Sequence, residues 1–282
     1  MLFYIQRAKE GQRMFSEDIN NLASVAEKKK TLLHESKFSY LLASMLAGIY
    51  VGFGILLIFT IGGLLQSTGT PGGKIIMGVS FGIALSLVLV AGSELFTGNN
   101  LIMMVGSLNK KVSWKDSVGV WIYSYIGNFL GSILLSILYV QSGLGTGDVA
   151  DFIISGSEGK IGAGFGPLFI RGILCNMLVC LAVWCFFKLK DETAKLIMIF
   201  WCLFAFITIG FEHSIANMTL ITTAMMLPHN GTISIAGLFQ NLIPVTLGNF
   251  IGGAIFIGWT YWRIANSKNK MKEAKDYGNI SK

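Results

Sequence analysis

The sequence predicts an all-α membrane protein with six membrane-spanning segments, arranged as two inverted halves of three spans, with spans 2 and 5 broken. Three observations lead to this fold class. Hydrophobic residues make up 53% of the 282 residues and charged residues only 13%, about half the ~25% of a soluble domain. Six long apolar stretches alternate with short polar ones. Two of these stretches are interrupted by related polar motifs.

The six predicted spans are apolar runs long enough to cross a bilayer, for which about 20 residues suffice. Their approximate bounds are 40–64, 74–107, 117–139, 167–187, 196–227 and 236–262. Spans 2 and 5 are too long for one crossing, which predicts a break within each. The segment 141–166 is rich in glycine and is predicted to be the longest loop.

Polar segments flank the six-span domain, which covers residues 38–262. Residues 1–37 are basic, and their apolar side chains fall at roughly helical spacing: Phe15, Ile19, Leu22, Val25 and Ala26. This pattern predicts an amphipathic helix on the cytoplasmic surface of the membrane; an element that binds a partner or gates the protein is the alternative. Residues 263–282 form a basic cytoplasmic tail. The start of the chain lacks the apolar core of a cleavable signal peptide.

The distribution of positive charge predicts that both termini are cytoplasmic. All but three of the 22 lysines and arginines lie in the termini or in the loops after spans 2 and 4, as the positive-inside rule requires. The exceptions are Lys74, Lys160 and Arg171. The same distribution argues against a nucleic-acid partner, which the net charge of +7 could suggest. The predicted surroundings are the lipid bilayer of the cytoplasmic membrane.

Related polar motifs interrupt spans 2 and 5. Residues 92–100 read Gly-Ser-Glu-Leu-Phe-Thr-Gly-Asn-Asn, and residues 210–218 read Gly-Phe-Glu-His-Ser-Ile-Ala-Asn-Met. Both contain Gly-x-Glu with an asparagine five residues after the glutamate. Ionisable residues at mid-membrane depth are costly, so they are functional candidates by default.

A second pair of motifs indicates an internal duplication. Gly-Asn-Phe-Leu-Gly at 127–131 in span 3 matches Gly-Asn-Phe-Ile-Gly at 248–252 in span 6, and the two glutamates and the two asparagines are 118 and 121 residues apart. Because each copy has an odd number of spans, the copies face opposite ways, and such repeats place their site near the midplane at broken helices. Broken helix ends expose backbone N–H groups and partial positive charge, which suit a small anion.

Neither an enzyme nor a cofactor site is predicted, so we expect no catalytic residues, no cofactor and no metal. The four cysteines lie in apolar runs, and the spacing of five between the first three spreads them around a helix: Cys175, Cys180, Cys185 and Cys202. This favours small buried apolar residues over a disulfide or metal site. The three histidines, at 34, 213 and 229, fall in unrelated segments.

The motifs resemble those of the formate/nitrite transporter family over residues 16–262. The matching stretches are 91–98, 172–184, 210–218 and 241–249, and the first two most resemble the nitrite-channel branch. The resemblance implies an aquaporin-like fold, a homopentamer with one pore per protomer, and passage of small monovalent anions, nitrite first and formate next. A hydrosulfide channel of the same family is the alternative. A water or glycerol channel is less expected, because paired Asn-Pro-Ala motifs are missing from the sequence.

The resemblance also implies the residues of the pore. His213 matches a central histidine that compensates the charge of the anion or passes it a proton, and Thr97 matches its hydrogen-bonding partner. Polar groups beside the histidine are Glu212, expected to fix its tautomer, and Asn176 and Asn249. Lys160 matches a lysine that draws the anion into an outer vestibule.

Two apolar constrictions are implied on either side of this centre. Phe81, Phe96 and Val179 match the outer constriction, and Leu85, Leu95 and Phe206 match the inner one. By spacing alone the three phenylalanines would be ordinary core residues. We further expect Asn128 to be the structural counterpart of Asn249, and Glu94 to anchor its break by accepting backbone N–H groups.

Overall fold

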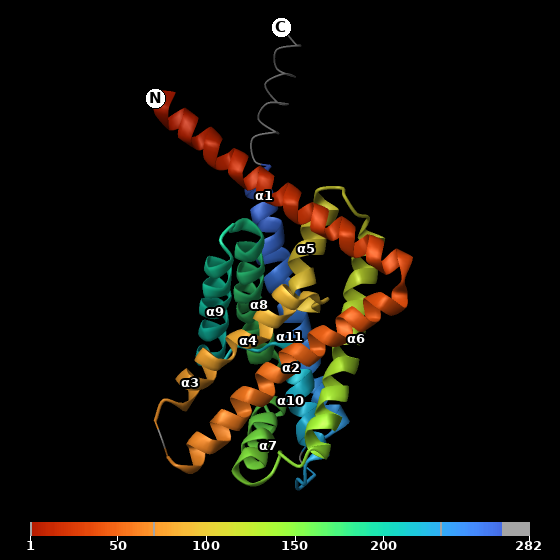
Figure 1. Cartoon of the computed structure of the whole chain (residues 1–282), viewed down its shortest axis with the longest axis vertical. Coiled ribbons are helices and arrows are strands. Elements are labelled where there is room, and N and C mark those ends of the chain that lie inside the picture. Colours follow the sequence, from red (N-terminus) through yellow and green to blue (C-terminus); the bar gives the residue numbers. More distant parts are fainter. Residues whose placement is uncertain (1, 70, 232, 267–282) are drawn as a thin grey trace.

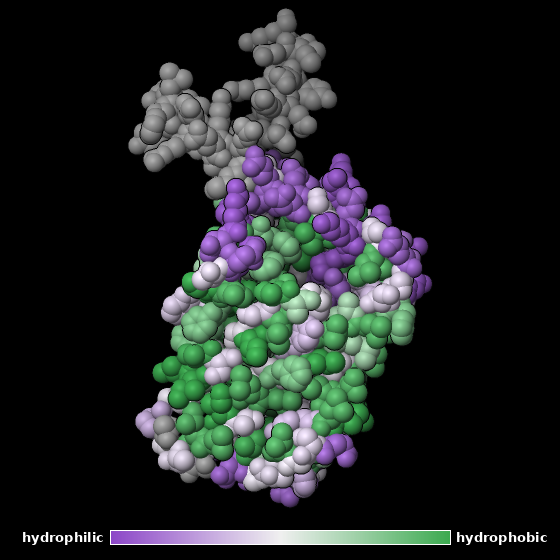
Figure 2. All heavy atoms as spheres, in the orientation of Figure 1, coloured by the Kyte–Doolittle hydropathy of each residue, from purple (hydrophilic) through white to green (hydrophobic). Residues whose placement is uncertain are grey.

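The computed structural model describes residues 2–69, 71–231 and 233–266 and is helical throughout (Figure 1). Within this part of the chain, six helical stretches are long and apolar enough to cross a membrane: 37–66, 73–92, 114–141, 165–188, 192–209 and 235–265. On the face shown in Figure 2 an apolar belt covers the middle of the molecule, and hydrophilic residues lie at both ends, most densely at the end formed by α1. These features confirm the predicted fold class.

The first half of the chain contains a helix that precedes the spans, two continuous spans and one broken span between them. In order these are α1 (Leu2–Glu35), α2 (Lys37–Ser67), the broken span α3 (Gly73–Ser80), α4 (Gly82–Ser86), η1 (Leu87–Gly92) and α5 (Phe96–Leu108), and then α6 (Trp114–Gln141). The break falls at Ser93–Leu95, where the backbone is extended. It lies inside the polar motif, as predicted.

The second half repeats this order. Its elements are α7 (Gly147–Ile161), α8 (Phe165–Lys188), the broken span α9 (Glu192–Ile209) and α10 (Ser214–Met226), and then α11 (Ile235–Phe250), η2 (Ile251–Trp259) and α12 (Thr260–Ala265). The break lies at Gly210–His213, again inside the polar motif. Residues 267–282 of the predicted basic tail lie outside the described residues.

The two halves run in opposite directions. From the middle of the molecule, α5 extends toward α1 whereas α10 extends toward α7 (Figure 1). The contacts match as well, because α5 packs against α1 and α10 against α7, while α2 packs against α6 and α8 against α11. Each repeat therefore contains the three predicted spans and one further helix, since α1 and α7 are also counterparts.

The segment 141–166 is not the long loop that its glycines suggested, because it contains α7. Its buried residues Ala150, Ile153 and Ser157 follow helical spacing. Glycine in a helix interior costs about 1 kcal/mol relative to alanine, and this weakened the helical signal. At Gly156 the absence of a side chain is needed, since a Cβ there would lie 2.6 Å from the ring of Phe59. Tertiary packing outweighs propensity here.

Helix α1 buries its apolar face against protein rather than lipid. Ile19, Leu22 and Ala26 are fully buried and cluster with Leu101 of α5. The predicted helix is present, but this part of it is packed onto the broken span instead of lying in the membrane surface.

The glycines of the two Gly-Asn-Phe-x-Gly motifs allow helices to cross at backbone contact. A Cβ on Gly131 would overlap the carbonyl oxygen of Met45, and one on Gly252 would overlap that of Ile173. The motifs thus bring α6 onto α2 and η2 onto α8. In each motif the asparagine between the glycines points toward the break of its own half and hydrogen-bonds to the backbone there.

Candidate functional site

Asn249 holds the break in span 5 through three backbone groups. Its Oδ1 accepts the N–H of Ser214, the first residue of α10, at 2.8 Å. Its Nδ2 donates to the carbonyl oxygens of Gly172 at 2.8 Å and Glu212 at 2.9 Å. One buried amide thus caps the broken helix and ties it to α8.

Asn128 makes the same three bonds in the other repeat. Its Oδ1 accepts the N–H of Phe96 at 2.9 Å, and its Nδ2 donates to the carbonyl oxygens of Ser44 at 2.7 Å and Glu94 at 2.9 Å. The structure therefore brings out the equivalence of the two asparagines. It also shows that the first N–H of each broken helix is already paired and does not face an anion.

Glu212 and Asn217 explain the glutamate–asparagine spacing in span 5. Asn217 Nδ2 donates to Glu212 Oε2 at 2.7 Å, closing a ring of side chains across the break. Lys160 Nζ donates to the same oxygen at 2.8 Å. Glu212 is only 3% exposed, so the ion pair neutralises a buried carboxylate. Lys160 is therefore held by Glu212, at the end of α7 rather than in a loop.

Glu94 has an equivalent set of partners in span 2. Lys29 of α1 lies 2.7 Å and 2.8 Å from its two oxygens. Tyr40 Oη donates at 2.7 Å and Asn99 Nδ2 at 3.1 Å. The donors are side chains and not the backbone N–H groups expected from the sequence. Lys29 corresponds in position to Lys160, which extends the inverted symmetry to α1 and α7.

His213 and Thr97 meet where the two breaks approach each other. The distance from His213 Nε2 to Thr97 Oγ1 is 3.0 Å, and Nδ1 accepts the N–H of Ala216 at 3.2 Å. Because Nδ1 is an acceptor, Nε2 carries the proton of the neutral ring and donates to Thr97. The backbone of α10, rather than Glu212, therefore fixes the tautomer, which corrects the expectation from sequence.

Asn176 connects the two breaks from behind. Its Nδ2 donates to the carbonyl oxygens of Thr97 at 3.2 Å and Asn249 at 2.6 Å. Its Oδ1 is buried without a hydrogen-bond partner among the described residues. Cys180 Sγ also donates to the Thr97 carbonyl oxygen, at 3.3 Å. Asn176 thus positions Thr97 and lines neither of the two cavities described next.

An apolar chamber of about 10 Å³ adjoins His213. Besides the histidine it is lined by Val51, Phe81, Ala84, Leu85, Leu95, Val179, Leu203 and Phe206. Its volume is at the lower limit for one water molecule, about 10–15 Å³. The side chains that line the chamber therefore leave no room for an anion to pass His213 in this conformation.

The residues expected in two constrictions are grouped differently in the structure. Phe81 and Phe206, expected on opposite sides of the centre, meet edge to face with ring centroids 5.4 Å apart. The division into an outer and an inner set is therefore wrong for this pair. Phe96 lies outside the chamber lining, and its ring packs on Tyr125 at 5.0 Å, because the break turns it toward α6.

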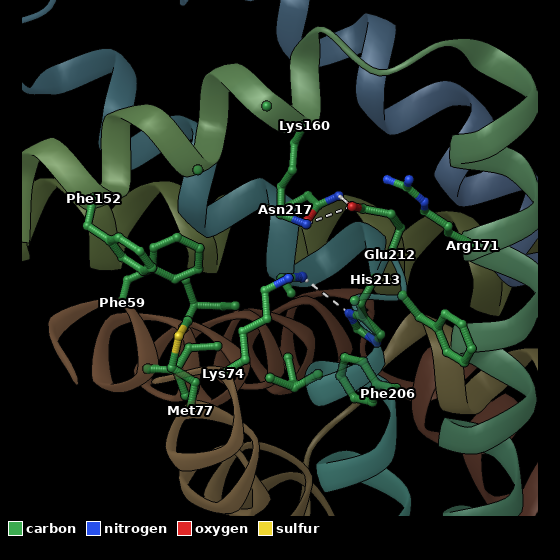
Figure 3. A pocket seen from close by; sticks show the side chains of 18 residues that line it. Phe59, Lys74, Met77, Phe152, Lys160, Arg171, Phe206, Glu212, His213 and Asn217 are labelled. Carbon is green, nitrogen blue, oxygen red and sulfur yellow. Dashed lines mark hydrogen bonds and ion pairs between the residues drawn. The ribbon is translucent and has the colours of Figure 1, made fainter. Parts of the chain in front are cut away.

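A cavity of about 330 Å³ opens on the other side of His213 and Phe206, which line both spaces. We call it the Lys160 vestibule. Figure 3 shows Lys74, Lys160 and Arg171 around it, with Glu212 and His213 on its wall. They come from α3, α7 and α8. The sequence predicted a role only for Lys160. Lys74 and Arg171 could have been identified by the same signal, because all three residues depart from the cytoplasmic distribution of positive charge.

Comparison with known proteins agrees with this architecture. A family model described as formate/nitrite transporter matches residues 16–263. The chain is 39% identical over 263 residues to the nitrite transporter NirC of Salmonella typhimurium, which covers 93% of this chain and 96% of that relative.

Two solved structures are similar over most of their length. One, an FNT family ion channel, has a TM-score of 0.83 and 38% identity, covering 87% of this chain and 98% of that one. The other, a pentameric formate channel with formate bound, has a TM-score of 0.70 and 29% identity, covering 80% and 96%. The chain therefore belongs to the formate/nitrite transporter family, which makes it a membrane transport protein rather than an enzyme.

Proposed function

We propose that the protein conducts small monovalent anions, nitrite or formate, across the cytoplasmic membrane through a pore in each protomer. The observation that carries this proposal is the place of His213. The imidazole lies between the two broken helices, with a charged vestibule on one side and an apolar chamber on the other. The names of the relatives, a nitrite transporter and a formate channel, support the same substrates.

The apolar chamber makes a bare anion costly to conduct. Moving an ion into apolar surroundings without a partner costs several kcal/mol or more. His213 is the polar side chain that borders the chamber, and its imidazole can carry a proton on either ring nitrogen. A proton supplied there converts the anion into its neutral acid, which crosses the apolar layer at a much lower cost.

The hydrogen bonds of His213 define how the proton would move. In the resting site the ring is neutral, with Nδ1 accepting from Ala216 and Nε2 donating toward Thr97. Protonation at Nδ1 requires the Ala216 N–H to give up its acceptor, and an anion arriving at Nε2 compensates the resulting imidazolium charge. The Nε2 proton then passes to an oxygen of the anion. The proton taken up from water at Nδ1 balances the one given up from Nε2, so the ring is neutral again and the acid crosses without net charge. The ring is then the Nδ1–H tautomer, and it returns to the resting form when Nδ1 loses its proton to water and Nε2 regains one.

The assembly and orientation belong to the same proposal. We infer a homopentamer, supported by the pentameric formate channel that the chain resembles. We also infer cytoplasmic termini, supported by the positions of nearly all lysines and arginines. The Lys160 vestibule then faces outward, and Lys29 lies at the cytoplasmic end.

The test is flux into proteoliposomes containing the purified protein. Nitrite, formate, hydrosulfide, lactate and glycerol are compared at two external pH values. We expect saturable uptake of nitrite or formate, faster at the lower pH and well above that of lactate. Greater hydrosulfide flux would favour the alternative within the family. Uptake of glycerol alone, or none above protein-free liposomes, would contradict the proposal.

A further inference from the structure

The three positive side chains that depart from the cytoplasmic distribution converge on one cavity. Lys74, Lys160 and Arg171 are far apart in the sequence and lie on three helices, yet all of them line the Lys160 vestibule. Basic side chains at the surface are usually just solvated. Here every lysine and arginine that is not in a predicted cytoplasmic segment faces the same space, which solvation alone does not explain.

Lys160 contributes little free charge to this space. Its ammonium lies 2.8 Å from Glu212 Oε2, and the side chains of the pair are 23% and 5% exposed. The lysine therefore compensates a buried carboxylate. An anion that bound to Lys160 would compete with Glu212 for it and would be repelled by the carboxylate.

Lys74 and Arg171 are in a different situation. Across the described ranges 2–69, 71–231 and 233–266, neither side chain takes part in an ion pair or hydrogen bond. Both are exposed. Glu212 offsets one of the three positive charges of the lining, so two remain uncompensated. Much of the remaining wall is apolar, including Phe59, Met77, Phe152 and Phe206. Such walls focus the field of the charges into the cavity.

We propose that Lys74 and Arg171, rather than Lys160, capture the anion in the vestibule, and that Arg171 selects planar anions with two oxygen atoms. The proposal rests on the proposed anion conduction. A guanidinium presents two parallel N–H groups that match two oxygens of one anion, as in nitrite and formate. Hydrosulfide, with one heavy atom, gains only the charge. Lys74 supplies a point charge without this geometry.

The first experiment replaces each cation by a neutral side chain of similar size. Uptake is measured in right-side-out and in inside-out membrane vesicles, so that the result does not depend on the assigned orientation. Lys74→Gln and Arg171→Gln should each raise the half-saturating concentration of nitrite or formate about three- to tenfold, from one face only, with the maximal rate unchanged. Lys115→Gln, at the opposite end of the molecule, is the control and should leave both parameters unchanged.

The second experiment separates charge from geometry. Arg171→Lys keeps the charge but loses the paired N–H groups, so half-saturation should rise for nitrite and formate and stay constant for hydrosulfide. Lys74→Arg keeps the charge and adds paired N–H groups, so half-saturation for nitrite and formate should not rise. Equal behaviour of Arg171→Lys and wild type toward nitrite would refute the selective role of Arg171.

The dependence of wild-type uptake on ionic strength provides a third test, which does not require that any variant folds. Exposed charges are screened over about 10 Å at 0.1 M salt, so half-saturation of the wild type should rise with salt. The Lys74→Gln/Arg171→Gln double variant should lose most of this rise. If the wild type conducts anions but neither single variant changes the half-saturating concentration, the capture site is refuted. It is also refuted if the variants lower only the maximal rate. A wild type without anion flux refutes the proposed function instead.

Discussion

At the scale of single residues, the charged groups around the breaks are held by specific partners. Glu212 is paired with Lys160 and Asn217, and Glu94 with Lys29 and Asn99. In a buried site, removing one partner of an ion pair leaves a charge uncompensated, which costs about 3–5 kcal/mol. The ion pair of Lys160 is therefore structural, and it is separable from the free cations that line the same vestibule.

Lys160→Met should destabilise the protein markedly, because the carboxylate of Glu212 loses its countercharge. We expect the free energy of unfolding to fall by about 3 kcal/mol or more, seen as a lower thermal midpoint in detergent. Combining it with Glu212→Gln removes the buried charge and should restore part of the loss. A single variant as stable as wild type would show that the pair is unimportant for folding.

The sequence revealed this site only in part. Glu212, His213 and Asn217 stand out because polar residues in an apolar run are rare. The pairing of Lys160 with Glu212 joins α7 to the break in span 5, between residues 52 apart in the sequence. No local pattern predicts such a contact. Likewise the Ala216 N–H competes for His213 Nδ1 only once α10 has formed, so Glu212 was the more obvious partner in the sequence.

At the scale of elements, close helix crossings set the positions of the breaks. The spans and their interruptions followed from length and composition, whereas α7 was hidden by its glycines. Gly156 among them serves packing against Phe59, whereas a side chain on Gly159 would meet nothing. The glycine content predicted a loop because composition carries no information about the helix that packs against this segment.

Gly131→Ala tests the crossing of α6 on α2. The added methyl group would overlap the carbonyl oxygen of Met45, and overpacking of this kind typically costs about 1–3 kcal/mol. We expect a lower thermal midpoint and a smaller yield of folded protein. Gly119→Ala on the same helix is the control, since its methyl group would meet only Leu33 at 3.4 Å. Equal stability of the two variants would contradict the role assigned to the motif.

At the scale of the whole molecule, the inverted repeat gives two similar ends with different electrostatics. Lys29 and Lys160 occupy corresponding places, and each is paired with the glutamate of its break. The Lys160 end carries in addition Lys74 and Arg171. The pseudo-symmetry therefore builds the central site, whereas the departure from symmetry distinguishes the two entrances.

The orientation of the whole molecule is testable by cysteine labelling. Ser142→Cys, in the turn after α6, should react with a membrane-impermeant maleimide in intact cells. Lys111→Cys, in the turn before α6, should react only after permeabilisation. The unmodified protein serves as the blank, since Cys175, Cys180 and Cys202 are buried and Cys185 is half-buried. The reverse labelling pattern would place the termini outside and refute the predicted orientation.

The account as a whole depends on His213, and His213→Asn is the variant that tests it most directly. Asparagine is a favourable N-cap, so α10 can remain capped while the titratable group is lost. Nitrite and formate flux into proteoliposomes is compared with wild type at two pH values. We predict a loss of about a hundredfold or more, as for removal of a proton-transferring group, and no acceleration at the lower pH. Flux and pH dependence equal to those of the wild type would contradict the central role of the histidine.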